Sequence, residues 1–292
     1  MKKYLKLFRV AQWIKNTFVF VPLLFSLNLF HPGYLLKSFG AFVLFCLLSS
    51  IVYIINDIAD IEADKLHPIK KNRQIASGKI SKVSALNAAA VLTVIVLLLL
   101  QIFNVKFMLT AAAYLSINIL YSYRLKHIVI LDVFLIAAGF MLRVMAGAYA
   151  IEVETSSWLI LTTMFVSLFL GVMKRRSELK LISNGDDAKF TRKVLAHYSS
   201  TFTDQMATVA AAGVIVCYAL YTVAQRTVNL FGTENMIYTT PFVVFGIFRY
   251  MYLVYLVEKG ESTSEIMITD MPMIINLTLY ILTTTLIIYS EI

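Results

Sequence analysis

The stretch LLKSFGAFVLFCLLSSIVYIINDIADIEAD, residues 35–64, places three aspartates directly after an apolar segment. An ideal helix turns about 100° per residue, which puts four polar residues within an arc of roughly 100°. They are Asn56, Asp57, Asp60 and Asp64. Glu62 points away from this arc. Carboxylates that share one face repel each other without a cation, and such oxygen ligands suit Mg²⁺, which usually shares its shell with water and substrate phosphates. A solvated helix end is the alternative interpretation.

The composition predicts a membrane protein. Of 292 residues, 59% are hydrophobic and 15% charged, and the mean hydropathy is +0.77. A span needs about 20 apolar residues, and nine segments are candidates: about 13–30, 35–55, 83–103, 107–122, 130–150, 157–173, 206–225, 237–257 and 273–290. We therefore expect an all-α, polytopic fold with nine transmembrane helices in a single domain, residues 1–292. The first apolar stretch lacks a small-residue cleavage site, so no secretory signal peptide is expected.

The distribution of positive charge predicts the orientation. Most of the 26 lysines and arginines lie in four regions, which are 1–16, 56–82, 122–129 and 174–203. The positive-inside rule places these regions in the cytoplasm and, with nine spans, the C-terminus outside. We expect a multi-pass protein of the inner (plasma) membrane with an active site on the cytoplasmic side. Residues 1–16 have the pattern of an amphipathic segment at the interface.

The net charge of +9 does not indicate nucleic acid, because the cations lie at the membrane surface without a soluble domain. Anionic lipid or a phosphorylated substrate fits that placement better. Cys46 and Cys217 lie inside predicted spans and are expected to be small core residues. The four histidines are scattered and show no ligand spacing, so we expect no zinc site.

Arg143 is an ionisable residue inside the fifth predicted span. It lies eleven residues after Asp132, on the same helix face, and between Gly139 and Gly147 at i−4 and i+4. Small residues mark a face where helices approach closely. An arginine in a membrane is costly enough to suggest a functional role. A buried structural pair with a carboxylate is the alternative, and the sequence leaves both open.

The sixth connection is strongly basic where it leaves the membrane, at Lys174, Arg175 and Arg176. Ion pairs from Glu178 to Lys174 and Arg175, at helical spacing, account for part of this pattern. Further along, Asp186 and Asp187 lie in an Asn-Gly-Asp-Asp sequence. Such a sequence is typical of a turn, which we favour there over a second metal site.

Several of these motifs together resemble a known family. They are QWIKN at 12–16, NDIADIEADKLHPIKKNRQIASG at 56–78, YSYRLKHIVILDV at 121–133, RVMAG at 143–147 and KRRSEL at 174–179. The chain resembles the UbiA superfamily of intramembrane prenyltransferases, and within it the branch of the decaprenyl-phosphate phosphoribosyltransferases. The resemblance implies a UbiA-like helical bundle with a central cavity that faces the cytoplasm.

The resemblance also implies a reaction: Mg²⁺-dependent transfer of 5-phosphoribose from phosphoribosyl diphosphate to a polyprenyl (decaprenyl-like) phosphate, in glycolipid or cell-wall biosynthesis. The implied metal ligands are Asp57, Asp60 and Asp64, with Asn56 as a further ligand or partner. The implied phosphate contacts of the donor are Lys70, Lys71 and Arg73. The acceptor headgroup would lie at Lys126, Lys174 and Arg175. Lys15 and Tyr121 would orient the donor, and Arg143 completes the expected substrate-binding set.

Two departures from the family pattern bear on the substrate. Prenyltransferases of this superfamily have a second aspartate-rich motif on the sixth connection, where this chain has KRRSE at 174–178. The loop after the first motif reads Arg73-Gln74 in place of Arg-Pro. One alternative is transfer of a prenyl group from prenyl diphosphate to an aromatic acceptor. Another is a transporter or lipid carrier, and the sequence leaves a homo-oligomer open.

Overall fold

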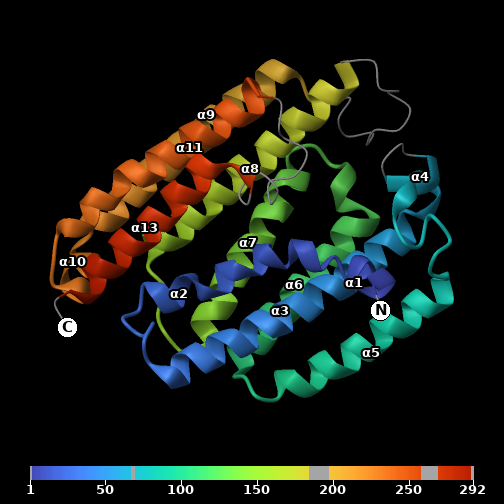
Figure 1. The fold of residues 1–292 in the computed structure, drawn as a ribbon, viewed down its shortest axis with the longest axis horizontal. Helices are drawn as coiled ribbons and strands as arrows, with labels where there is room; N and C mark the ends of the chain where they lie inside the picture. The colour runs from blue at the N-terminus through green and yellow to red at the C-terminus, as the bar shows by residue number, and fades with distance from the viewer. Residues whose placement is uncertain (1, 67–69, 184–196, 258–268, 291–292) are drawn as a thin grey trace.

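The computed structural model describes residues 2–66, 70–183, 197–257 and 269–290, and within these ranges the regular structure is entirely helical (Figure 1). The elements in chain order are α1 Lys2–Leu7, η1 Val10–Phe20, α2 Val21–Leu24, α3 Pro32–Ala59, α4 Ile61–Leu66, η2 Lys70–Asn72, α5 Lys82–Leu100, α6 Val105–Tyr123, η3 Leu125–His127, α7 Leu131–Ala150, α8 Ser157–Ser183, α9 Ser200–Val223, α10 Gln225–Phe231, η6 Asn235–Thr239, α11 Thr240–Tyr255 and α13 Met271–Tyr289. The all-α class expected from the sequence is confirmed.

Eight of these helices are long and apolar enough to cross a membrane. The ninth expected span, at 13–30, is instead a shorter apolar segment, Val10–Leu24. Most of it is a 3₁₀ helix of 11 residues, followed by one α-helical turn with Pro22 near its start. Proline lacks an N–H and is tolerated in a first turn. Because a 3₁₀ helix rises about 2.0 Å per residue, this segment reaches farther than an α-helix of equal length.

Helix α7 joins the two halves of the bundle. It packs against η1, α3 and α6 on one side and against α8 on the other. Its Ala146 and Ala150 belong to the core of the N-terminal half, whereas Val133 and Ala137 belong to the core of the C-terminal half. Figure 1 shows α7 between the blue and orange ends of the chain. A residue on α7 can therefore contact elements far apart in the sequence.

At Gly147, η1 packs closely against the predicted small-residue face of α7. A Cβ atom there would lie 2.0 Å from the carbonyl oxygen of Val19, so η1 approaches α7 to backbone contact. Gly139 is less crowded, because a Cβ would lie 3.5 Å from Nη1 of Arg143. The close approach therefore concerns one of the two glycines.

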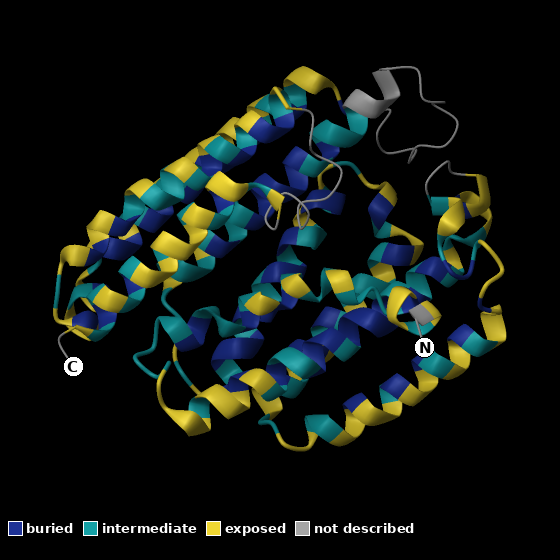
Figure 2. Ribbon diagram, viewed as in Figure 1, coloured by how far each residue is buried: buried dark blue, intermediate teal, exposed yellow. Residues whose placement is uncertain are grey.

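The outer surface of the bundle is apolar, as expected of helices that face lipid. Leu98 on α5, Leu109 on α6 and Leu286 on α13 are each more than half exposed, and Figure 2 shows exposed residues along the outer side of α5. Cys46 and Cys217 are buried and free, as the sequence predicted. The segment 1–16 differs from a purely interfacial one, because Leu7 is 1% exposed and packs in the core.

One sequence prediction falls outside the described residues. The turn at Asp186 and Asp187 lies in 184–196, so the connection 174–203 is described only at its two ends. The cytoplasm-facing central cavity stays a prediction.

Candidate active site

The three aspartates lie where α3 passes into α4, which we call the acidic end of the bundle. The two helices are nearly continuous: the amide of Asp60 donates to the carbonyl of Asn56 at 3.0 Å, and the amide of Asp64 donates to the carbonyl of Asp60 at 2.8 Å. Asp57 and Asp64 are buried, and Asp60 is half-buried. Glu62 is exposed and pairs with Lys65 at 2.8 Å. The helix face that carries the three aspartates is therefore more buried than the opposite face, which carries Glu62.

Asp57 and Asp64 converge on one cation. Nη1 of Arg73 lies 2.6 Å from Oδ2 of Asp64 and 3.2 Å from Oδ1 of Asp57. Arg9 also forms an ion pair with Asp57, and its guanidinium lies 4.8 Å from the centre of the Tyr53 ring. Two carboxylates that are 16 and 9 residues away from Arg73 in sequence therefore share its charge.

The loop after α4 holds Arg73 in this position through its own apolar side chains. Ile75 and Ile80 are buried in the core of the N-terminal half. Gly78 has a φ of 73°, a left-handed conformation that glycine adopts without a Cβ clash. The amide of Ile80 donates back to the carbonyl of Gln74 at 3.0 Å. These contacts close the loop and fix the backbone that carries Arg73.

Asp60 pairs with a different cation. Nζ of Lys126 lies 2.6 Å from Oδ1 of Asp60, and the Lys126 side chain is only 9% exposed. Lys126 belongs to η3, in the turn between α6 and α7, so this ion pair brings the predicted connection 122–129 to the acidic end. No group of three carboxylate, histidine or cysteine side chains among the described residues is arranged to hold a metal by itself.

The acidic end nevertheless suits Mg²⁺ together with a substrate. This ion is usually bound through one or two carboxylates plus substrate phosphates and water. Asp57 and Asp64 supply two buried carboxylates that already meet at one positively charged nitrogen. Asn56 is half-buried beside them, and the hydrogen bonds between described side chains do not include its amide. The donors present are therefore hard oxygens, with Asp60 held close by Lys126.

Arg143 is buried among neutral partners. Its Nε donates to Oδ1 of Asn16 at 2.7 Å, and its Nη2 donates to the hydroxyl of Tyr114 at 2.8 Å. Its guanidinium also lies 4.8 Å from the Tyr114 ring centre. Within the described residues no carboxylate forms an ion pair with Arg143, and its partners there are the neutral groups of Asn16, Gly139 and Tyr114. The charge remains uncompensated by these neighbours.

Lys15 lies near this uncompensated charge. The positive charges of Lys174, Arg143 and Arg9 all act on its ammonium group, and ion pairs between described residues do not include it. We call Lys15, Arg143 and Lys174 the cationic cluster. The neighbouring QWIKN residues anchor η1 to α3: Trp13 Nε1 donates to Ser50 at 3.1 Å, and Asn16 donates to Ser49 at 3.2 Å. This anchoring fixes the position of Lys15 between them.

Arg175, which the resemblance places at the acceptor headgroup, is buried. Its side chain is 1% exposed, and Nε lies 2.7 Å from Oδ2 of Asp132. It also forms an ion pair with Glu178 and donates to the hydroxyl of Tyr121 at 3.3 Å. A guanidinium that is buried between two carboxylates is not available at the surface. Lys70 and Lys174 are half-buried, whereas Lys71 is exposed.

Tyr198 completes this buried network. Its hydroxyl donates to Oδ1 of Asp132 at 2.8 Å and accepts from the amide of Ile130 at 2.7 Å. Burial and the hydrogen bond to Asp132 raise the pKa of Tyr198 to about 12. Tyr198 therefore stays protonated as a donor. Neither Tyr198 nor Arg9 was singled out from the sequence, because each meets its partner across a large sequence separation that no local pattern encodes.

Comparisons with known proteins agree with this architecture. A model of the UbiA prenyltransferase family matches residues 17–271. The chain belongs to the UbiA prenyltransferase family. A structure of a UbiA homolog from Archaeoglobus fulgidus bound to GPP and Mg²⁺ superimposes on this family member with a TM-score of 0.73. The two chains are 17% identical, and the match covers 98% of this chain and 99% of the other. This likeness shows the fold.

Curated relatives of this UbiA family member are more similar in sequence. A decaprenyl-phosphate phosphoribosyltransferase from Mycolicibacterium smegmatis is 34% identical over 229 residues, which is 77% of this chain and 71% of the relative. A protein of the same name from Corynebacterium glutamicum is 34% identical over 252 residues, covering 84% of this chain and 75% of the relative. These matches confirm the resemblance that the motifs indicated, both to the UbiA family and to its branch of decaprenyl-phosphate phosphoribosyltransferases.

Proposed function

We propose that this protein transfers 5-phosphoribose from phosphoribosyl diphosphate to a polyprenyl phosphate and releases diphosphate. The observation that carries the proposal is the separation of charge at the acidic end. Asp57, Asp60 and Asp64 form one acidic group. Arg143 is instead held by the neutral groups of Asn16, Gly139 and Tyr114, and its positive charge acts on Lys15 together with that of Lys174. One metal diphosphate and one second anion match these two groups. The curated relatives of the same name support this substrate pair.

The acidic end would hold the diphosphate of the donor. Asp57 and Asp64, with Asn56 beside them, would bind Mg²⁺, which supplies neutralisation of the charge on the departing diphosphate. Arg73 and Arg9 already contact these carboxylates and can turn their remaining N–H groups toward phosphate oxygens. Lys70 and Lys71 follow in the same loop. Lys126 next to Asp60 adds a further cation where charge develops.

The cationic cluster would receive the phosphate of the lipid acceptor. Arg143 keeps its planar guanidinium oriented by Asn16, Tyr114 and its own helix backbone. A buried charge whose neighbours are neutral or cationic gains most from an anionic ligand. The polyprenyl tail would lie between helices, and the headgroup would reach Lys15 and Lys174. Arg175 would contribute indirectly, by fixing Tyr121 and the start of α7.

The chemistry requires little proton transfer. The second pKa of a phosphate monoester is near 6, so the acceptor oxygen is ionised at neutral pH. It can attack C1 of the ribose without a general base, while the bond from C1 to the diphosphate oxygen breaks and the diphosphate leaves with the electron pair. The residues of the site then act by orienting the two anions and stabilising the leaving group.

The same proposal includes the orientation expected from the positive charges. The acidic end carries the basic connections 56–82 and 122–129, so we place it and the N-terminus in the cytoplasm, with the membrane being the inner membrane. Transfer of a prenyl group to an aromatic acceptor is the alternative. It would require a second aspartate-rich motif for the metal-bound diphosphate of the prenyl donor, where this chain has KRRSE with Arg175 buried against Asp132 and Glu178.

A transfer assay tests the proposal. Membranes that contain the protein are incubated with radiolabelled phosphoribosyl diphosphate, decaprenyl phosphate and Mg²⁺, and the label is counted in the lipid phase. We expect label in the lipid that depends on both the acceptor and Mg²⁺. Absence of such transfer, with transfer from prenyl diphosphate to an aromatic acid instead, would overturn the proposal. Membranes without the protein are the control.

A further inference from the structure

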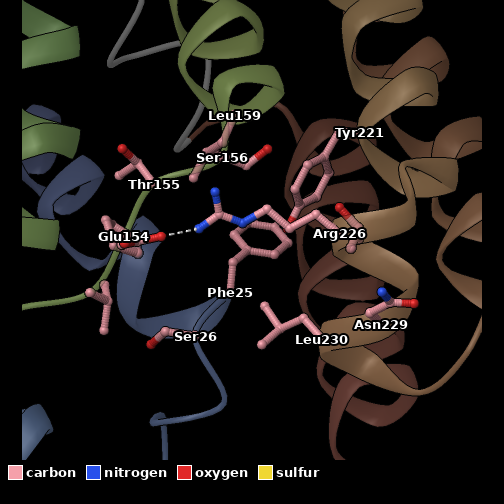
Figure 3. A pocket seen from close by; sticks show the side chains of 13 residues that line it. Phe25, Ser26, Glu154, Thr155, Ser156, Leu159, Tyr221, Arg226, Asn229 and Leu230 are labelled. Atoms are coloured by element: carbon pink, nitrogen blue, oxygen red, sulfur yellow. Dashed lines mark hydrogen bonds and ion pairs between the residues drawn. The ribbon is translucent and has the colours of Figure 1, made fainter.

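A cavity opens at the end of the bundle opposite the acidic end. Its volume is about 740 Å³, within the range of roughly 300–1,000 Å³ typical of ligand sites. Four parts of the chain line it: Phe25 and Ser26 directly after α2, the connection 153–156 with the start of α8, the end of α9 with Tyr221, and α10 with Arg226. Figure 3 shows side chains from all four meeting around one space. No residue of the proposed active site lines this cavity.

Opposite charges lie side by side in this cavity. Nη2 of Arg226 lies 2.9 Å from Oε2 of Glu154, and the two side chains are 57% and 88% exposed. In Figure 3 the Arg226 side chain reaches across the cavity to Glu154. Exposed ion pairs of this kind contribute little to stability, so a ligand with both charges can replace the pair at small cost. The guanidinium has five N–H donors, of which this bond uses one.

Tyr221 adds a polar group to the wall of the cavity. It is 4% exposed, and the hydrogen bonds between described residues do not include its hydroxyl. Its ring packs edge-on against Phe25, with ring centres 5.6 Å apart. Figure 3 shows Tyr221 pointing into the cavity between Phe25 and Arg226. The Tyr221 hydroxyl can both donate and accept a hydrogen bond, so a ligand atom in the cavity can pair with it.

The loops that form the cavity hold uncommon backbone conformations. Leu27 has a φ of 61° and Glu152 a φ of 59°, and they lie next to the lining segments 25–26 and 153–156. Left-handed conformations are uncommon for residues other than glycine, and they persist where the surrounding structure requires them. Both loops are therefore shaped around this space at a cost in backbone energy.

We propose that this cavity binds a zwitterionic phospholipid. The phosphate lies against Arg226 and the hydroxyl of Tyr221, and the ammonium group lies against Glu154. The apolar side chains of Phe25, Leu159 and Leu230, which also line the cavity, contact the glycerol and the first part of the acyl chains. The paired charges favour a headgroup that carries both signs. An anionic lipid would leave the Glu154 carboxylate beside its phosphate. The site lies at the end of the helices, where headgroups meet the apolar layer.

Lipid binding to the purified full-length protein tests this proposal. Native mass spectrometry in detergent compares dioleoyl phosphatidylethanolamine, dioleoyl phosphatidylglycerol and soluble glycerophosphoethanolamine. We expect the wild type to prefer the ethanolamine lipid over the glycerol lipid by about tenfold, the effect of one charge-assisted contact. Binding of the soluble headgroup as strongly as the lipid would contradict the lipid part of the proposal.

Substitutions of the residues that line the cavity test whether the lipid binds there. Glu154→Gln should abolish the preference for the ethanolamine lipid, because Glu154 contacts the ammonium group. Arg226→Gln and Tyr221→Phe should each weaken binding of both lipids several-fold, because their side chains contact the phosphate that both lipids share. Lys37→Gln is the matched control, because Lys37 is 56% exposed and pairs with Glu152 outside the cavity lining. It should leave the preference unchanged. A preference of Glu154→Gln equal to that of the wild type, or unchanged lipid binding by Arg226→Gln, would overturn the proposal. Both substituted side chains are exposed enough to leave the fold intact.

Discussion

Nζ of Lys126 lies 2.6 Å from Oδ1 of Asp60, which joins the turn between α6 and α7 to the acidic end of α3. The two residues are 66 positions apart in the sequence. The Lys126 side chain is 9% exposed, so its ammonium group is directed at the carboxylate and away from solvent. This ion pair places a cation beside the group of aspartates that is proposed to hold the donor diphosphate.

Replacing Lys126 should reduce transfer strongly. We expect Lys126→Met to lower the rate constant kcat about 100-fold, because a buried cation next to the leaving group is lost and Asp60 is left without its partner. Lys79→Met is the control, since Lys79 is exposed in the loop before α5. The measurement is label transfer to lipid at saturating substrates. Equal activity of the two variants would show that the ion pair has no part in the reaction.

Substitution of a buried acidic residue should reduce transfer far more than substitution of an exposed one. Asp57→Asn and Asp64→Asn should each leave less than about 1% of the wild-type transfer, because each removes a carboxylate that is proposed to hold the metal diphosphate. Glu62→Gln should be mild, because Glu62 is exposed and pairs with Lys65. Expression should be near normal in all three. Comparable losses in Asp57→Asn, Asp64→Asn and Glu62→Gln would contradict the assignment of one inward face.

The sequence predicted the helical class, the positions of eight long helices and the family, because apolar runs and motif spacing are local properties. It placed Asp57 and Asp64 on one face for the same reason. It could not predict that Arg9 reaches Asp57, since this depends on a left-handed turn at Arg9 with a φ of 50°. It also missed the burial of Arg175, whose partner Asp132 is 43 residues away. Basic residues at a membrane edge look alike in sequence whether they face solvent or a buried carboxylate.

Arg175 should be a structural residue. Arg175→Met should lower the free energy of unfolding by about 3–5 kcal/mol, because Asp132 would be left buried without a counter-charge. Arg176→Gln should cost at most about 1 kcal/mol, since its partner Asp204 is 40% exposed. Thermal unfolding of the purified variants measures both. The double variant with Asp132→Asn should recover part of the loss. A thermal transition of Arg175→Met equal to that of the wild type would contradict the buried network.

Alanine substitutions of Gly139 and Gly147, both on α7, should have different effects on stability. Gly147→Ala should destabilise the protein, because the added Cβ would lie 2.0 Å from the carbonyl oxygen of Val19 and η1 would have to move. Gly139→Ala should be neutral or stabilising, since its Cβ would meet Nη1 of Arg143 at an ordinary 3.5 Å and alanine favours a helix by about 0.5–1 kcal/mol. Thermal unfolding distinguishes them. The opposite order would show that η1 does not pack against α7 as described.

The choice between two donors distinguishes phosphoribosyl transfer from prenyl transfer. Purified protein is given phosphoribosyl diphosphate and a prenyl diphosphate together, with decaprenyl phosphate, an aromatic acid and Mg²⁺, and the lipid products are identified by mass spectrometry. We expect a single new lipid, decaprenyl phosphate extended by one 5-phosphoribosyl group, which disappears when Mg²⁺ is chelated and in Asp57→Asn. A prenylated aromatic acid as the product, with decaprenyl phosphate unchanged, would contradict this expectation.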